Sequence, residues 1–139
     1  MTKSVAVHFV RIEGTEAGLG RIGSRTVIAD RPQGMSGGQG LGFHGAELLA
    51  SALGGGFWNE LHIVAHAART PITVDSVKVT MGLAGNPPRV VRAHVAVRLA
   101  GSDPDQLRTI FNDTTEISTV ANTMRAAFPI HFEQLTEVP

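Results

Sequence analysis

Apolar residues recur at helical spacing over the longest patterned segment of the chain, from Ala46 to about Arg69. The apolar positions are Leu48, Leu49, Ala52, Leu53, Phe57, Leu61, Val64, Ala65 and Ala68. Besides Arg69, the only full charges in the segment are Glu47 and Glu60. The spacing predicts one long helix that ends before Pro71. Because this helix is apolar around most of its circumference, we expect it to be central and buried on most sides.

Strands and shorter helices are predicted on both sides of this helix. Residues 5–12 and 21–29 are expected to form a hairpin, with a loop over residues 13–20. Residues 73–82 and 89–99 alternate between apolar and polar positions and predict a second hairpin. Asp103 and Pro104 begin a helix, a short helix follows over residues 120–127, and a last strand runs from Pro129 through Leu135. The order β-β-α-β-β-α-α-β predicts one α+β domain over residues 1–139, with the long helix at its centre.

Glycine is concentrated in two places along the chain. Residues 33–45 carry six glycines and predict an irregular loop, longer than most connections in compact domains. Gly54, Gly55 and Gly56 lie inside the predicted long helix, where each costs roughly 1 kcal/mol relative to alanine. We expect the close approach of another backbone, or of a ligand, to offset that cost.

Composition and charge limit the classes of function. The 139 residues carry no net formal charge, and no basic run is interleaved with aromatic residues, so we expect no nucleic-acid partner. No apolar stretch approaches the length of a membrane span and the first residues lack a secretory pattern, so we expect a cytoplasmic location and no membrane partner. The chain has no cysteine, which excludes disulfides, thiolate metal sites and thiolate nucleophiles.

A set of short motifs before and within the long helix matches one known pattern. The motifs are Asp30-x-Pro32, Gly37-Gly38, Gly42 and the run Glu47-Leu48-Leu49-Ala50-x-Ala52-Leu53-Gly54-Gly55. Together they resemble the OsmC/Ohr family of hydroperoxide-reducing proteins, and the resemblance covers nearly the whole chain. In that family a peroxidatic cysteine follows the double glycine and a resolving cysteine begins a later segment, whereas here Gly56 and Ser118 stand at those positions. The resemblance therefore implies a member that lacks both redox cysteines and has no cysteine-based peroxidase activity.

The resemblance also implies an OsmC-like fold that forms an intertwined homodimer, with a pocket at the subunit interface between the two central helices. A family glutamate beside the thiol matches Glu47, and the arginine that pairs with it corresponds to Arg25 or Arg21. His44 lies three residues before Glu47. It either forms an acid–base pair with Glu47 or is a solvated loop histidine.

Small residues near the lost cysteine position leave space for a ligand. Ser51, Gly54, Gly55 and Gly56 are all small, so the region can hold a molecule larger than a hydroperoxide. We add three residues to this candidate ligand set, Ser118, Phe57 and Trp58. The sequence therefore predicts binding of a small, largely apolar organic molecule, without a cofactor.

Two alternatives to ligand binding stay open. In the first, the chain is an enzyme that uses acid–base chemistry in the same pocket, with Glu47 or His44 as the base and Arg25 or Arg21 stabilising developing negative charge. In the second, Phe57 and Trp58 close the space, and the chain has a structural or partner-binding role.

His62 and His66 are four residues apart on the predicted helix, a spacing that lets two imidazoles bind one metal ion. No third ligand lies close to them in sequence, so Asp75, Glu60 or a histidine of a second copy would have to complete the site. Packing on a helix surface or at an interface is the simpler interpretation. We therefore predict no metal site.

Overall fold

The computed structural model describes residues 2–135. In chain order its elements are β1 (His8–Arg11), β2 (Gly18–Ile22), β3 (Arg25–Ala29), α1 (Gly45–Ala67), β4 (Thr73–Ala84), β5 (Arg89–Ala100), α2 (Pro104–Ile117), α3 (Thr119–Arg125) and β6 (Ile130–Leu135). The chain divides into two compact units, one ending at Leu48 and the other beginning at Leu49. The α+β class and the long helix are confirmed, while a single domain over residues 1–139 stays a prediction.

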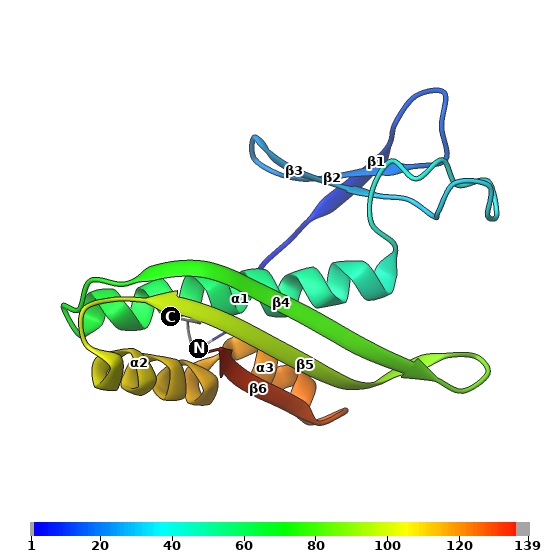
Figure 1. Ribbon diagram of the computed structural model, residues 1–139. Coiled ribbons are helices and arrows are strands. Elements are labelled where there is room, and N and C mark those ends of the chain that lie inside the picture. The colour runs from blue at the N-terminus through cyan, green and yellow to red at the C-terminus, as the bar shows by residue number, and fades with distance from the viewer. Residues whose placement is uncertain (1, 136–139) are drawn as a thin grey trace. The chain divides into compact units, whose positions relative to one another are not determined.

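The first unit contains an antiparallel sheet in the order β1-β2-β3 (Figure 1). The single strand predicted over residues 21–29 was wrong, because the chain turns at Gly23 and Ser24 and pairs Ile22 with Arg25. Gly23 has a φ of 60°, a conformation that glycine adopts without steric cost. The predicted loop over residues 13–20 likewise contains the first residues of β2.

The glycine-rich segment after β3 is organised around Asp30, which is 5% exposed. Its carboxylate accepts hydrogen bonds from the backbone N–H groups of Gln39 and Leu41, both at 3.1 Å, and from that of Arg31 at 2.8 Å. These donors, the N–H of Leu41 foremost, hold the pKa of Asp30 below its ordinary value although burial acts to raise it. Asp30 therefore fixes the loop as an anion in a ring of backbone donors.

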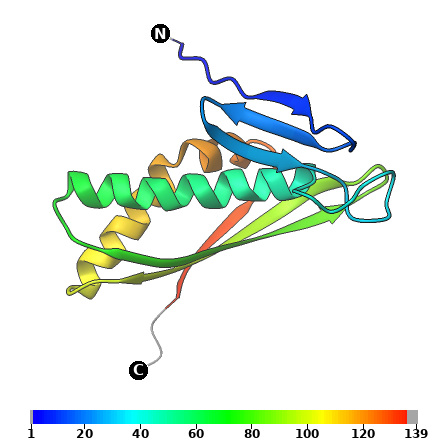
Figure 2. The same ribbon diagram turned by 90° about the horizontal axis from the view of Figure 1, so that it is seen from above.

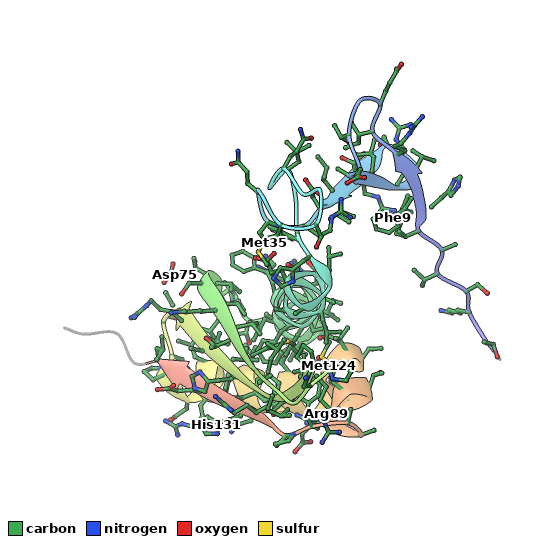
Figure 3. The ribbon with its side chains drawn as sticks, turned by 90° about the vertical axis from the view of Figure 1, so that its right-hand side faces the viewer. Phe9, Met35, Asp75, Arg89, Met124 and His131 are labelled. Carbon is green, nitrogen blue, oxygen red and sulfur yellow. The ribbon has the colours of Figure 1, made fainter. Side chains whose placement is uncertain are left out.

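The second unit contains the sheet β4-β5-β6, in which β4 and β5 are antiparallel and β5 and β6 are parallel. Helices cover one face of this sheet (Figure 2). Alternate residues of β5 are buried against them: Ala93, Val95, Val97 and Leu99. On the other face His131 points away from the helices (Figure 3), stacked at 5.2 Å on His94. Period-two alternation in β5 thus sets which face of the sheet forms the core.

Helix α1 contributes one buried stripe to that core. Leu53, Phe57, Leu61 and Ala65 are buried at successive i, i+4 positions. Phe57 packs between Phe111, with ring centroids 6.1 Å apart, and Phe132, at 4.9 Å. Trp58 and Ile63 are 38% and 61% exposed. Within the described residues of one chain, α1 is therefore buried along one side only, not on most sides as its sequence predicted.

Candidate functional site

A hollow of about 410 Å³ lies over the small-residue side of α1, next to β4. It is lined by Ala50, Ser51, Gly54, Gly55, Trp58, Val77 and Val79. Four of these, Ser51, Gly54, Gly55 and Trp58, belong to the candidate ligand set from the sequence. The structure therefore brings these four residues together, and adds Ala50 of α1 and two valines of β4, none of which belonged to the candidate ligand set.

The three consecutive glycines of α1 have different surroundings. A Cβ built on Gly54 would lie 3.0 Å from Cγ2 of Val79, so another side chain presses closely on this position. A Cβ on Gly56 would lie 3.4 Å from Cγ2 of Val120, which is ordinary contact. A Cβ on Gly55 would meet nothing within 4 Å in the described chain. Of these three glycines, only Gly54 has a neighbour within residues 2–135 that accounts for its missing side chain.

The remaining members of the candidate ligand set lie elsewhere. Phe57 is fully buried in the core, so it neither lines nor fills the hollow. Gly56 faces Val120 of α3. Ser118 is fully buried, and its Oγ accepts a hydrogen bond from the backbone N–H of Ala121 at 3.3 Å, as the N-cap of α3.

Glu60 is a polar residue of this region that the sequence named only as a possible third metal ligand beside His62 and His66. Its Oε2 accepts a hydrogen bond from the backbone N–H of Thr119 at 2.8 Å, which joins α1 to the start of α3. Its Oε1 is buried and has no hydrogen-bond partner among the described residues. That oxygen would lie 3.9 Å from a Cβ on Gly56. The position of Glu60, one helical turn after Gly56, is the only sequence signal that pointed to it.

His44 and Glu47 contact each other at the start of α1. Oε1 of Glu47 accepts a hydrogen bond from the backbone N–H of His44 at 3.0 Å and lies 3.4 Å from its Nε2. This is the arrangement of a capping box, in which a glutamate in the first turn reaches back to the residue before the helix. Both side chains are about half exposed. The pair therefore has a structural role at the helix start.

The two candidate arginines lie in the first sheet, Arg21 on β2 and Arg25 on β3. Within residues 2–135 neither arginine forms an ion pair with Glu47. Arg25 instead lines a separate hollow of about 190 Å³ with Val7, Gly20, Ile22, Thr26 and Val27.

The described chain contains neither a metal-binding cluster of three ligands nor a membrane-spanning helix. Residues 2–135 contain no group of three or more histidine, aspartate or glutamate side chains placed to hold a metal ion. None of the helices described has the length and apolar character needed to cross a bilayer.

Known proteins share both the sequence pattern and the fold of this chain. The family model described as OsmC-like protein matches residues 37–133, which is well over half of the chain. The chain belongs to the OsmC-like family. Because this OsmC-like chain has no cysteine, it also lacks both of the redox cysteines expected from the family resemblance. A search of curated proteins found no match.

Solved structures share the OsmC-like fold along almost the full chain. A protein from Psychrobacter arcticus, described as an osmotic stress induced and detoxification response protein, aligns with a TM-score of 0.79 at 20% identity, over 97% of this chain and 98% of its own. An OsmC-like protein from Mycoplasma pneumoniae aligns with a TM-score of 0.77 at 16% identity, over 97% and 98%. The organic hydroperoxide resistance protein OhrB of Bacillus subtilis gives 0.67 at 14%, over 94% and 98%. At these identities the likeness establishes the fold alone.

Proposed function

We propose that this OsmC-like chain binds a small, largely apolar organic molecule and does not act as a thiol peroxidase. The observation that carries this proposal is the hollow of about 410 Å³ beside Gly54 and Gly55. Its volume falls in the range of small-molecule sites, which are mostly apolar with a few polar groups. Trp58, Val77 and Val79 supply apolar surface, and Ser51 supplies a hydroxyl.

The absence of cysteine removes the chemistry for which the fold is otherwise suited. Peroxide reduction by a protein thiol needs a thiolate as the nucleophile, and no other side chain of this sequence replaces it at neutral pH. The retained space and the lost sulfur together favour binding over redox turnover.

We further propose that the hollow is completed by a second copy of the chain in a homodimer. The support is the surface of α1, on which large apolar side chains remain exposed, Trp58 at 38% and Ile63 at 61%. Exposed apolar surface on a central helix is typical of an association surface. A site shared between two copies would also enclose a ligand more fully than the open hollow of one chain.

The proposal also covers the location and the partners of the protein. We propose a cytoplasmic protein with no nucleic-acid partner, supported by the balanced charge and the absence of cysteine. His44, Glu47 and one arginine, Arg25 or Arg21, are proposed as polar contacts for the ligand.

The proposal is tested with N-phenyl-1-naphthylamine, a neutral apolar dye whose emission rises when it leaves water. Trp58 is the only tryptophan and lines the hollow, so energy transfer from it reports dye bound to the chain, and the variants below test whether the dye lies at the hollow. We expect saturable transfer in the native protein and its loss in a Gly55→Leu variant, which fills open space. Ala52→Leu is the matched control, since Ala52 is exposed on the same helix and lies outside the hollow. Non-saturable transfer, or equal binding by the Gly55→Leu variant, contradicts the proposal.

A second candidate function is supported by the contact between His44 and Glu47. An imidazole and a carboxylate 3.4 Å apart are a recognisable acid–base pair. Under this alternative a bound metabolite is consumed rather than only bound. Glu47→Gln keeps a carbonyl oxygen for the backbone N–H of His44 but removes the base, so turnover falls while the thermal midpoint stays within about 2 °C, a change worth under 1 kcal/mol. A bound metabolite recovered unchanged after long incubation would favour binding alone.

A further inference from the structure

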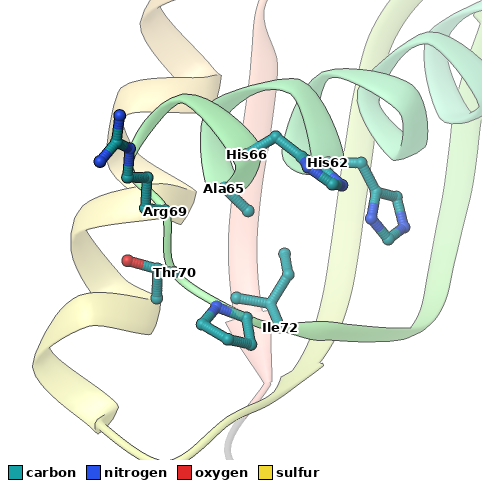
Figure 4. A pocket seen from close by; sticks show the side chains of 7 residues that line it. His62, Ala65, His66, Arg69, Thr70 and Ile72 are labelled. Carbon is teal, nitrogen blue, oxygen red and sulfur yellow. The ribbon is translucent and has the colours of Figure 1, made fainter.

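The last turns of α1 hold two histidines on one side of the helix. His62 and His66 line a pocket of about 380 Å³ together with Ala65, Arg69, Thr70, Pro71 and Ile72. Figure 4 shows both imidazoles extending to the same side of α1, above Ile72, while the guanidinium of Arg69 is directed away from them. The pocket is thus a hollow in which two imidazole side chains lie near one another.

Although the sequence alone predicted no metal site, we propose that His62 and His66 form a binding site for one transition-metal ion of the kind that prefers imidazole, such as Cu(II) or Zn(II). Residues four apart on a helix have Cβ atoms about 5–6 Å apart, which allows two imidazoles to reach one ion. Imidazole nitrogen suits copper, nickel and zinc, whereas magnesium and calcium prefer carboxylate oxygen. No carboxylate lines this pocket, so its chemistry selects the first group.

The electrostatic surroundings of the pair are mixed, because the cationic Arg69 also lines the pocket, although its guanidinium is directed away from the imidazoles. His66 lies in the last turn of α1, where the carbonyl ends of the helix carry partial negative charge. Among the residues from 2 to 135, neither imidazole is engaged in a hydrogen bond or an ion pair with another side chain. The nitrogen lone pairs are therefore available, which distinguishes this pair from His94, whose Nε2 lies 2.9 Å from the carboxylate of Glu133.

The number of ligands sets the kind of site. No third histidine, aspartate or glutamate joins the pair in the described chain. The ion would keep open coordination positions filled by water, as in metal sites that exchange ligands rather than closed structural sites. The site is therefore expected to bind metal reversibly and to contribute little to folding.

The chain carries its own reporter for this site. The ring centroid of Trp58 lies 6.1 Å from that of His62, one helical turn away. A paramagnetic Cu(II) ion bound by His62 therefore lies close enough to quench Trp58, the only tryptophan. Zn(II) has a filled d shell and does not quench in this way, so it serves as a competitor that restores the emission.

The experiment titrates tag-free, chelator-treated protein with Cu(II) while the emission of Trp58 is recorded, and with Zn(II) by calorimetry. We expect saturable quenching at one ion per chain, reversed by a large excess of Zn(II), which imidazole sites bind less tightly than Cu(II). His62→Ala and His66→Ala are each expected to raise the half-saturating concentration of both metals by at least about tenfold, because two ligands become one. His131→Ala keeps the helix pair and is expected to bind as the native protein does.

A spacing variant separates chelation from histidine content. In the double variant His66→Ala, Ala67→His the chain keeps the same number of histidines, but the second one lies five residues after His62 and on another side of the helix. Its affinity is expected to match that of His66→Ala alone. The proposal is overturned if the native protein gives no saturable binding, or if the spacing variant or either single variant binds within twofold of the native protein.

Discussion

Gly55 is the most direct place to test whether the hollow beside α1 is open. The perturbation is Gly55→Ala, which adds one methyl group in the middle of a long helix. Nothing in the described chain lies within 4 Å of the position that this methyl would take. In the absence of other copies or ligands, the substitution therefore changes only the backbone contribution to the free energy of unfolding.

The expected magnitude follows from helix propensity and from the neighbours of each glycine. Alanine is favoured over glycine inside a helix by about 0.8–1 kcal/mol. For a chain of 139 residues, a gain of about 1 kcal/mol raises the thermal midpoint by roughly 3–5 °C. Gly54→Ala is the matched control, because its Cβ would lie 3.0 Å from Cγ2 of Val79, and this close approach offsets the gain. We therefore expect Gly55→Ala to be clearly more stable than Gly54→Ala.

The assay is thermal and urea unfolding of the native protein and both variants without ligand. Each measurement is made at two protein concentrations tenfold apart, because association of native chains makes the midpoint depend on concentration. A Gly55→Ala variant that is less stable than the native protein would refute the reasoning. That result would mean that a backbone or side chain from another copy already fills the space, so that the hollow is closed before any ligand arrives.

Three further predictions concern the chemistry, the α3 cap and the glycine-rich loop. With cumene hydroperoxide and a dithiol, the protein is expected to give no reduction above a protein-free control; measurable turnover would contradict the thiol argument. Ser118→Ala is expected to lower the free energy of unfolding by about 1 kcal/mol through loss of the cap on Ala121, measured by urea unfolding with exposed Ser102→Ala as control. Asp30→Asn is expected to hasten proteolysis within residues 31–42, since two backbone donors lose their anionic acceptor. Because the pKa of Asp30 is lowered on folding, the stabilisation from its carboxylate is complete above the ordinary value of 3.8 and is lost as pH falls through the lower folded value. The free energy of unfolding of Asp30→Asn is therefore expected to fall less steeply with decreasing pH than that of the native protein.

Much of the fold followed from periodicity alone. The predicted helix from Ala46 to Arg69 is α1 to within two residues at its end, and the predicted strands over 73–82 and 89–99 are β4 and β5. These elements could be predicted because one face of each is buried, so apolar residues recur with a period of 3.6 in the helix and 2 in the strands. The strand break at Gly23 was not readable, because neither face of that short sheet carries a strong apolar pattern.

The sequence predicted only part of the candidate site, because it does not show which side of the helix each residue faces. Small residues on α1 indicated missing volume, but not which of them face outward. Gly56 and Phe57 follow Gly55 directly, yet helical rotation turns the former toward Val120 and the latter into the core. The side chain of Glu60 is held by a hydrogen bond between its Oε2 and the backbone N–H of Thr119, fifty-nine residues later in the chain, which leaves its Oε1 without a partner among the described residues. No local sequence pattern encodes such a contact.

The two sides of α1 differ in how much they contribute to stability. Phe57 is fully buried between two other rings, so Phe57→Ala is expected to cost about 3–5 kcal/mol. The neighbouring open position, Gly55, is expected to gain stability on the same change to alanine, and unfolding of the two variants side by side measures the contrast. If both changes were destabilising to a similar extent, the faces would not be independent. Because stability depends on the buried stripe and the hollow lies on the small-residue side, the residues of the hollow can change without loss of the fold.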